Sequence, residues 1–179
     1  MEKKLARIKL LALDVDGVLT DGTINIGSDG ELFKSFNAKD GLGISAGLRV
    51  GLKIAIITGR KSSIIHKRAE ELGITLLCEG VKDKFAELKR LQNNLELSKE
   101  EIAYMGDDLN DLPAFQAAGI AFAPADAVAE VKNAANIVLP NNGGRGAVRA
   151  AIELILKSQN EWEEVVAGYQ KVVTVNDAQ

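Results

Sequence analysis

Acidic residues gather in two short, turn-forming segments of the chain. Asp14 and Asp16 lie in the run Asp-Val-Asp-Gly, and Asp107, Asp108 and Asp111 lie in the run Gly-Asp-Asp-Leu-Asn-Asp. Aspartate and glycine are common in turns, but carboxylates this close in sequence repel one another unless a cation lies between them. Magnesium prefers carboxylate, water and phosphate oxygens. The two runs therefore indicate a magnesium site suited to phosphate chemistry.

Each acidic run directly follows an apolar segment of the kind that forms a buried strand, at residues 8–13 and 102–105. Further strands are expected at 53–57, 74–78, 119–122 and 137–139, and helices at 40–50, 62–72, 84–95, 109–118, 127–133 and 147–157. Ser62 is placed to cap the second of these helices. Strands alternating with helices predict an α/β fold with a doubly wound parallel sheet, which binds ligands beyond the carboxyl ends of its strands. Both acidic runs fall at such ends.

Residues 22–36 interrupt this alternation. Two strand-like segments flank the turn-rich Gly27-Ser28-Asp29-Gly30 and predict a projecting β-hairpin. Residues 1–157, including this hairpin, are expected to form one domain, because they contain no repeat or linker. Residues 158–179 are expected to form an amphipathic tail that packs on the same or a neighbouring subunit. Its apolar stripe consists of Trp162, Val165, Val166, Tyr169, Val172 and Val173.

Composition limits the location and the partners. The chain has 179 residues, is 46% hydrophobic and 26% charged, and carries a net charge of -3, so no overall basic field favours a nucleic-acid partner. No stretch reaches the roughly 20 apolar residues that a membrane span needs. Cys78 is the single cysteine, which excludes an intramolecular disulfide, and the Met-Glu-Lys-Lys start lacks the apolar run of a secretory signal. We expect a cytoplasmic protein without membrane contact.

Four segments, in order, resemble the motifs of the haloacid dehalogenase superfamily. They are Asp14 to Thr20, Thr58-Gly59-Arg60, Lys84, and Gly106 to Asp111. Together the four motifs span most of the chain, and only their combination is specific to the superfamily. The resemblance implies a magnesium-dependent phosphatase that acts through an aspartyl-phosphate intermediate.

The same resemblance implies a role for each matching residue. Asp14 would be the nucleophile and a metal ligand, Asp16 the general acid and base that also offers its backbone carbonyl to the metal, and Asp107 a further metal ligand. Thr58 and Lys84 would hold the phosphate, with Gly59 in the same loop.

The sequence allows more than one role for each of three nearby residues. Lys82 is a rival of Lys84, which we favour because it opens a helix as in the family motif. Asp111 is expected to anchor the ammonium group of Lys84, or simply to be an acid in the first turn of a helix. Asp108 is expected either to bind a metal-coordinated water or to complete the turn.

The intervals between the motifs leave no room for a cap domain, so the chain resembles the capless subgroup. Enzymes of this subgroup act on macromolecules or close their sites by oligomerisation, and we expect a homotetramer to which the hairpin contributes. Three segments, namely 18–22, 39–43 and 142–146, resemble enzymes of this subgroup that act on a phosphorylated eight-carbon sugar acid. Arg60 would then bind the carboxylate of the substrate by a bidentate contact, or else face solvent. Arg145 is a further candidate contact within its glycine-rich turn.

Two other classes of protein share some of these features. A phosphorelay receiver also combines a doubly wound sheet, clustered acids, magnesium and a lysine, but its phosphoacceptor follows the third strand, where this chain has Cys78-Glu79-Gly80. A non-catalytic scaffold with this fold would not need both Asp14 and Asp16. A phosphatase for another sugar phosphate, for a nine-carbon keto-acid phosphate or for a nucleic-acid phosphate end is the remaining alternative.

Overall fold

The computed structural model describes the backbone of residues 1–176 and the side chains of residues 1–171. Within this part of the chain, six strands form one parallel sheet in the order β5-β4-β1-β6-β7-β8. They are β1 (Leu10–Leu13), β4 (Lys53–Ile57), β5 (Leu76–Cys78), β6 (Ile102–Met105), β7 (Ile120–Ala123) and β8 (Ile137–Val138). The predicted doubly wound parallel sheet is confirmed.

The register of the central strands aligns their carboxyl ends. Leu13, the last residue of β1, is level with Ile56 of β4 and Met105 of β6, and the Asp14 N–H donates to the Met105 carbonyl at 3.1 Å. The loops that begin at residues 14, 58 and 106 therefore leave the sheet side by side, at the edge where parallel α/β sheets bind ligands.

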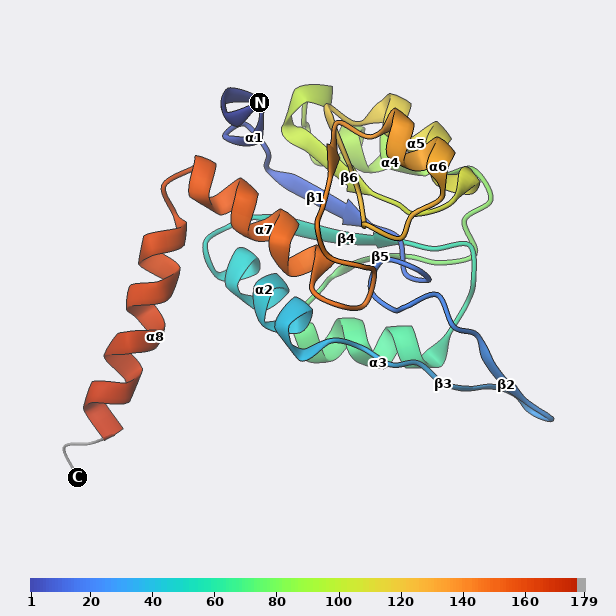
Figure 1. The fold of residues 1–179 in the computed structure, drawn as a ribbon, viewed down its shortest axis with the longest axis horizontal. Coiled ribbons are helices and arrows are strands. Elements are labelled where there is room, and N and C mark those ends of the chain that lie inside the picture. The colour runs from blue at the N-terminus through green and yellow to red at the C-terminus, as the bar shows by residue number, and fades with distance from the viewer. Residues whose placement is uncertain (177–179) are drawn as a thin grey trace.

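Helices cover both faces of the sheet (Figure 1). One face carries α2 (Ala38–Arg49), α3 (Ser63–Leu72) and α7 (Ala147–Ser158), and the other carries α4 (Lys84–Asn94), α5 (Leu112–Ala117) and α6 (Ala129–Ala134). Successive strand residues point to opposite faces, so Leu11 and Leu13 join the first core while Leu10 and Ala12 join the second. Burial on both faces explains why these strands are continuously apolar.

The predicted hairpin consists of β2 (Asn25–Gly27) and β3 (Gly30–Phe33), an antiparallel pair that projects away from the sheet (Figure 1). Between β1 and β4 the chain forms this hairpin and α2, and between β4 and β5 it forms α3. Residues 14–78 thus contain no inserted cap domain.

Several element boundaries differ from the sequence-based expectation. Residues 109–118 form a 3-10 turn (Leu109–Asp111) followed by α5, rather than a single helix, because Asp108 and Asp111 hydrogen-bond the backbone of the turn. Ile8 does not belong to β1, because its N–H donates to the Leu5 carbonyl at the end of α1 (Glu2–Leu5).

The tail forms α8 (Trp162–Asn176). Val165 is buried against the core and Trp162 is partly buried, with the Arg149 guanidinium 4.8 Å from the Trp162 ring centroid. Val166 and Tyr169 are exposed, and the side chains of Val172 and Val173 lie outside the described residues. Among the described residues, no helix is long and apolar enough to cross a membrane.

Candidate active site

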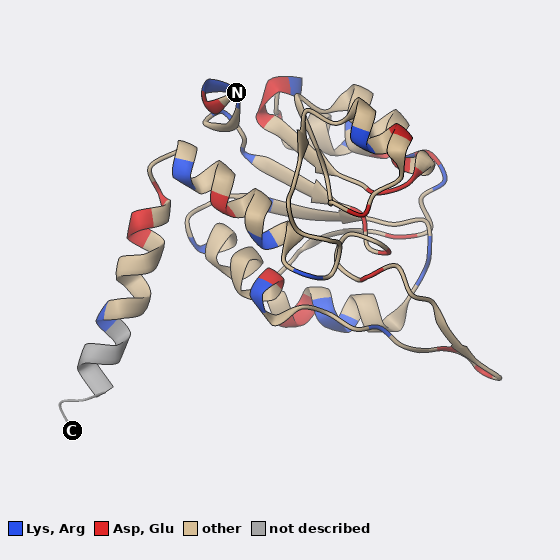
Figure 2. Cartoon of the chain, viewed as in Figure 1, with Lys and Arg blue, Asp and Glu red and all other residues tan. Residues whose placement is uncertain are grey.

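The loops that follow β1, β4 and β6 enclose a pocket of about 250 Å³ at the carboxyl edge of the sheet. Figure 2 shows acidic segments, in red, in the loops at the end to which the strand arrows point. The pocket is lined by Asp14, Asp16, Gly22, Thr58, Gly59, Arg60, Asp107, Asp108 and Asn110. Residues from three of the four motifs thus meet in one cavity, although up to 96 positions separate them in the chain.

A buried lysine lies behind the nucleophile candidate. Lys84 is the first residue of α4 and is 3% exposed, and its Nζ lies 2.9 Å from Asp14 Oδ2 and 2.7 Å from Asp111 Oδ1. Asp83 caps this helix by accepting from the Ala86 N–H, which fixes the position at which Lys84 enters the site. Lys82 is exposed. The structure therefore brings Lys84, and not Lys82, to Asp14.

Asp111 is fully buried and uses both of its carboxylate oxygens within the protein. Oδ1 accepts from Lys84 Nζ and from the Tyr104 hydroxyl, each at 2.7 Å. Oδ2 accepts from the backbone N–H groups of Asp107 at 2.9 Å and Asp108 at 3.3 Å. With these acceptors occupied, Asp111 serves as an anchor that holds Lys84 and shapes the acidic loop.

Asp107 shows the opposite pattern, because its buried Oδ1 has no hydrogen-bond partner among the described residues. Carboxylate oxygens of Asp14, Asp107 and Asp111 lie within 4.8 Å of one another. A side chain at Gly17, where φ is +85°, would collide with the Asp107 carboxylate, so the glycine lets the two acidic loops approach. An orphaned carboxylate oxygen facing further carboxylates is a donor set that fits magnesium.

Asp14 and Asp107 have raised pKa values in the metal-free protein. Burial, together with the charge of Asp111, raises the pKa of Asp14 to about 6, and the charge of Lys84 opposes the rise. Burial and the charges of Asp111, Asp14 and Asp108 raise the pKa of Asp107 to about 7. A bound cation would reverse both shifts, because it favours the ionised carboxylates.

The loop after β4 supplies a hydroxyl group and a cation. Thr58 is buried, its N–H donates to the Cys78 carbonyl at 2.9 Å, and its Oγ1 accepts from the Arg60 N–H at 3.3 Å. The Arg60 side chain is 47% exposed, and its Nε lies 3.9 Å from Asp16 Oδ2. Arg60 therefore reaches the pocket from its solvent side.

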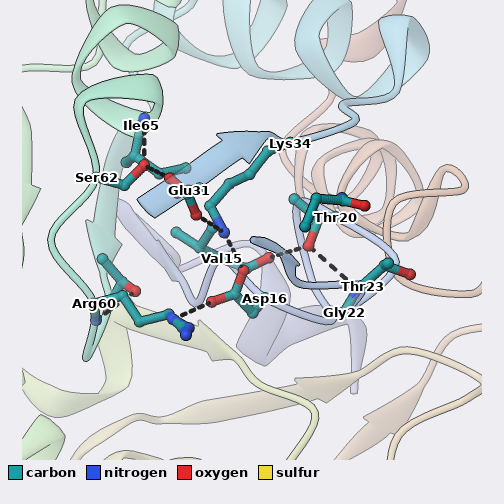
Figure 3. A network of polar contacts seen from close by, with 12 residues as sticks. Val15, Asp16, Thr20, Gly22, Thr23, Glu31, Lys34, Arg60, Ser62 and Ile65 are labelled. Atoms are coloured by element: carbon teal, nitrogen blue, oxygen red, sulfur yellow. Dashed lines mark hydrogen bonds and ion pairs between the residues drawn. The ribbon is translucent and has the colours of Figure 1, made fainter. Parts of the chain in front are cut away.

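Asp16 is in contact with a residue that no sequence motif indicated. Lys34, just after β3, is an ion-pair partner of Asp16 and of Glu31 (Figure 3). Burial would lower the pKa of Lys34, but hydrogen bonds to Asp16 and Glu31 raise it above its usual value. A lysine beside an expected hairpin resembles a surface lysine, and no local pattern in the sequence distinguishes the two.

The two remaining candidates lie at the margin of the site. The Asp108 Oδ1 accepts from the Leu109 N–H at 2.7 Å and so completes the turn. Arg145 is exposed, pairs with Asp21 at 3.5 Å and does not line the pocket. Its loop nevertheless packs on the loop that follows β1, since a side chain at Gly143 would collide with the Gly17 carbonyl.

Comparison with known proteins agrees with this geometry. Residues 78–152 match the model of the haloacid dehalogenase-like hydrolases. Across 161 residues the chain is 43% identical to the 3-deoxy-D-manno-octulosonate 8-phosphate phosphatase of Haemophilus influenzae, covering 90% of this chain and 89% of that protein. The chain therefore belongs to the haloacid dehalogenase-like hydrolases, and it is a phosphomonoester hydrolase.

Solved structures with the same fold carry the same enzyme name. The phosphatase from Moraxella catarrhalis, described in complex with a magnesium ion, a phosphate ion and 3-deoxy-D-manno-octulosonate (KDO), has a TM-score of 0.91 at 40% identity and covers 94% of this chain and 97% of its own. The 3-deoxy-D-manno-octulosonate 8-phosphate phosphatase from Yersinia pestis has a TM-score of 0.88 at 42% identity, covering 90% and 88%. This level of identity extends over nearly the whole chain.

Proposed function

We propose that this protein is a magnesium-dependent phosphatase that converts KDO 8-phosphate into KDO and phosphate, a step in the synthesis of lipopolysaccharide precursors. The observation that carries the proposal is a pocket lined by Asp14 and Asp107, in which Lys84 contacts Asp14 from behind and an Asp107 oxygen has no partner among the described residues. The identity to phosphatases of this name over 90% of the chain supports the substrate.

In this mechanism an Asp14 carboxylate oxygen attacks phosphorus, and the bond from phosphorus to the sugar oxygen breaks. Asp16 donates its proton to that oxygen as the alcohol leaves. Asp16 then takes a proton from water, whose oxygen attacks phosphorus and releases phosphate and the Asp14 carboxylate. Covalent capture on Asp14 divides one displacement into two.

Charge compensation makes the first step possible, because an anionic carboxylate must approach an anionic phosphoryl group. Lys84 supplies a fixed cation 2.9 Å from Asp14 Oδ2. Asp14, Asp107 and the Asp16 backbone carbonyl would hold magnesium, which supplies Lewis-acid stabilisation of the phosphoryl oxygens when bound. Thr58 offers a hydroxyl group at the same pocket.

Arg60 is the residue to which we assign recognition of the sugar-acid carboxylate. Its guanidinium group extends from the phosphate-binding loop, lines the pocket and is half exposed, so it can turn from Asp16 to an incoming carboxylate. A planar guanidinium suits bidentate contact with a carboxylate. A nine-carbon keto-acid phosphate is the alternative substrate, and Arg145 is a further candidate contact.

The active form is proposed to be a homotetramer in which the hairpin forms part of the contact between subunits. Ile26, Leu32 and Phe33 of the hairpin are each more than half exposed, and exposed apolar side chains gathered on one short element are typical of interaction sites. We also place the enzyme in the cytoplasm, where its free, buried Cys78 would stay reduced. Light scattering of Leu32→Asp against the wild type tests the assembly, and a wild-type monomer with full activity would contradict it.

Phosphate release across a panel of sugar phosphates tests the substrate. KDO 8-phosphate is expected to have a kcat/KM roughly 10- to 100-fold above that of six-carbon sugar phosphates lacking a carboxylate, since a charged hydrogen bond contributes about 1.5–3 kcal/mol and each 1.4 kcal/mol is about tenfold. Turnover must disappear when magnesium is chelated and return when it is restored. An equal preference for an unrelated phosphate would contradict the assignment.

A further inference from the structure

Lys34 is placed where it can control the orientation of Asp16. Its side chain is 2% exposed, and its Nζ lies 2.5 Å from Asp16 Oδ1 and 2.9 Å from Glu31 Oε1 (Figure 3). The two carboxylates come from different elements, since Asp16 lies in the loop after β1 and Glu31 in β3. The lysine therefore ties the hairpin directly to the loop that carries the nucleophile.

The same contacts continue to the helix that follows the phosphate-binding loop. The Ser62 hydroxyl donates to Glu31 Oε2 and also accepts from the Ile65 N–H at 3.3 Å, which caps α3. The network in Figure 3 thus runs from Asp16 through Lys34 and Glu31 to Ser62. At one end of the network, Asp16 lines the pocket. At the other end, Ser62 directly follows the loop whose Arg60 also lines it.

The two oxygens of Asp16 face different cations. Oδ1 contacts the buried Lys34, whereas Oδ2 lies 3.9 Å from the Nε of Arg60, whose side chain is 47% exposed. The first contact is short and shielded from solvent, and the second is long and open to the pocket. A ligand carboxylate could displace Arg60 without disturbing the contact with Lys34.

Lys34 is a charged group buried at the base of an exposed hairpin, which is energetically costly. The desolvation of a lysine is expensive, and replacing a buried ion pair with apolar side chains is often neutral or stabilising. Every residue of β3 is exposed, so Lys34 differs from the strand that precedes it. The contact with Lys34 fixes one Asp16 oxygen and leaves the other on the pocket side, an arrangement that suits catalysis.

We propose that Lys34 is a positioning residue for the phosphatase reaction, holding Asp16 Oδ1 so that Oδ2 faces the leaving oxygen of the substrate. The inference rests on the proposed function of Asp16. It makes the base of the hairpin part of the active site, in addition to any role of the hairpin tip in assembly. Lys34 does not itself line the pocket and acts through Asp16, which does.

The test compares Lys34→Met with the wild type on two substrates with different leaving groups. For KDO 8-phosphate, whose alcohol needs a proton, kcat is expected to fall about 100-fold, the lower range of general acid–base contributions, while KM changes less than about threefold. For p-nitrophenyl phosphate, whose phenolate leaves without a proton, formation of the phosphoenzyme should be nearly unaffected and its hydrolysis slowed. The variant should then show a burst of about one nitrophenolate per active site.

Lys34→Arg, which retains the charge and hydrogen-bonding capacity, is expected to recover at least about a tenth of the wild-type kcat. Lys53→Met is the matched control, because Lys53 is exposed at the opposite end of the sheet, and it should behave as the wild type. If Lys34→Met proves unstable, Glu31→Gln, which removes the second carboxylate that holds Lys34, is used for the same measurements of kcat and of the nitrophenolate burst.

Two results would overturn the inference. One is an unchanged kcat of Lys34→Met on KDO 8-phosphate, and the other is an equal loss on both substrates without a burst, which a general loss of structure would produce. These results are distinct from failure of the proposed function, in which the wild type itself would release no phosphate from KDO 8-phosphate.

Discussion

The two sides of the pocket are built in different ways. The metal side, defined as Asp14, Lys84, Asp107 and Asp111, rests on β1, β6 and α4 and is largely buried. The hairpin side, defined as Asp16, Glu31, Lys34 and Arg60, depends on a two-stranded sheet with exposed strands and on a half-exposed arginine.

The charges on the two sides of the pocket suit different parts of the chemistry. The metal side has three carboxylates around one lysine, so it needs a further cation and is suited to phosphate and magnesium. The hairpin side has two carboxylates around Lys34 and Arg60, and it is suited to proton transfer and substrate recognition. Under the proposed function, phosphoryl chemistry would take place beside the buried sheet, and substrate recognition at the more exposed side of the pocket.

Asp14→Asn gives the largest effect that we expect on the metal side. The amide is a poor nucleophile, so phosphate release should fall by at least about 1,000-fold, as when a catalytic nucleophile is removed. Steady-state assays measure the rate, and thermal unfolding checks that the variant is folded. A variant that kept more than a tenth of the wild-type rate would exclude Asp14 as the nucleophile.

Lys84→Met tests whether the metal side depends on its buried cation. The substitution leaves Asp14 and Asp111 without their partner, and the free energy of unfolding should fall by about 3–5 kcal/mol. Urea denaturation without magnesium provides the measurement. Lys82→Met, at an exposed position of the same loop, should stay within about 0.5 kcal/mol of the wild type, and equal losses in the two variants would be inconsistent with the account.

Magnesium should stabilise the metal side in a pH-dependent manner. The folded-state pKa values of Asp14 and Asp107, about 6 and about 7, exceed the usual 3.8, so the folded protein binds more protons than the unfolded chain between these limits. The contribution of these two groups to stability is therefore present at low pH and is lost as the pH rises through about 6 and about 7.

Magnesium replaces those protons, so its stabilising effect should grow with pH. At 100 times its dissociation constant, magnesium should add about 2.7 kcal/mol to the free energy of unfolding. At a fixed magnesium concentration this gain should be smaller at about pH 5, which lies below the higher of the two pKa values, than at about pH 8, which lies above it. Thermal unfolding with magnesium or a chelator measures the gain. Asp107→Asn should weaken it, and a gain independent of pH would argue against these ligands.

Arg60→Met addresses selectivity on the hairpin side and has the smallest expected effect. KM for KDO 8-phosphate should rise roughly 10- to 100-fold, because a charged hydrogen bond to the carboxylate is lost. A phosphate ester without a carboxylate should show no change. Lys61→Met, in the same loop and exposed, is the control. An equal rise in KM for both substrates upon Arg60→Met would show that Arg60 does not recognise the carboxylate.

The sequence predicts the parts of this molecule that local patterns determine. Apolar runs indicated the six strands of the sheet to within about two residues, and the expected cap at Ser62 is confirmed by its bond to the Ile65 N–H. The acidic runs were placed at the correct edge because the carboxyl ends of parallel strands meet there.

Long-range contacts set the features that were missed. Lys34 pairs with a residue 18 positions away, through a hairpin whose orientation no local pattern specifies. Asp40 accepts from the Gly146 N–H at 3.0 Å and the Arg149 N–H at 2.7 Å, which fixes the glycine-rich loop from over 100 positions away. Such pairings depend on tertiary packing and leave no periodic signal in the sequence.

The most direct test of the account is a crystal structure of the protein with magnesium and trifluoroberyllate, an analogue of the transferred phosphoryl group. The account predicts beryllium bonded to an Asp14 carboxylate oxygen, with magnesium about 2.0–2.1 Å from oxygens of Asp14, Asp107 and the Asp16 carbonyl. Beryllium bonded to any other residue, or magnesium bound away from Asp107, would contradict it.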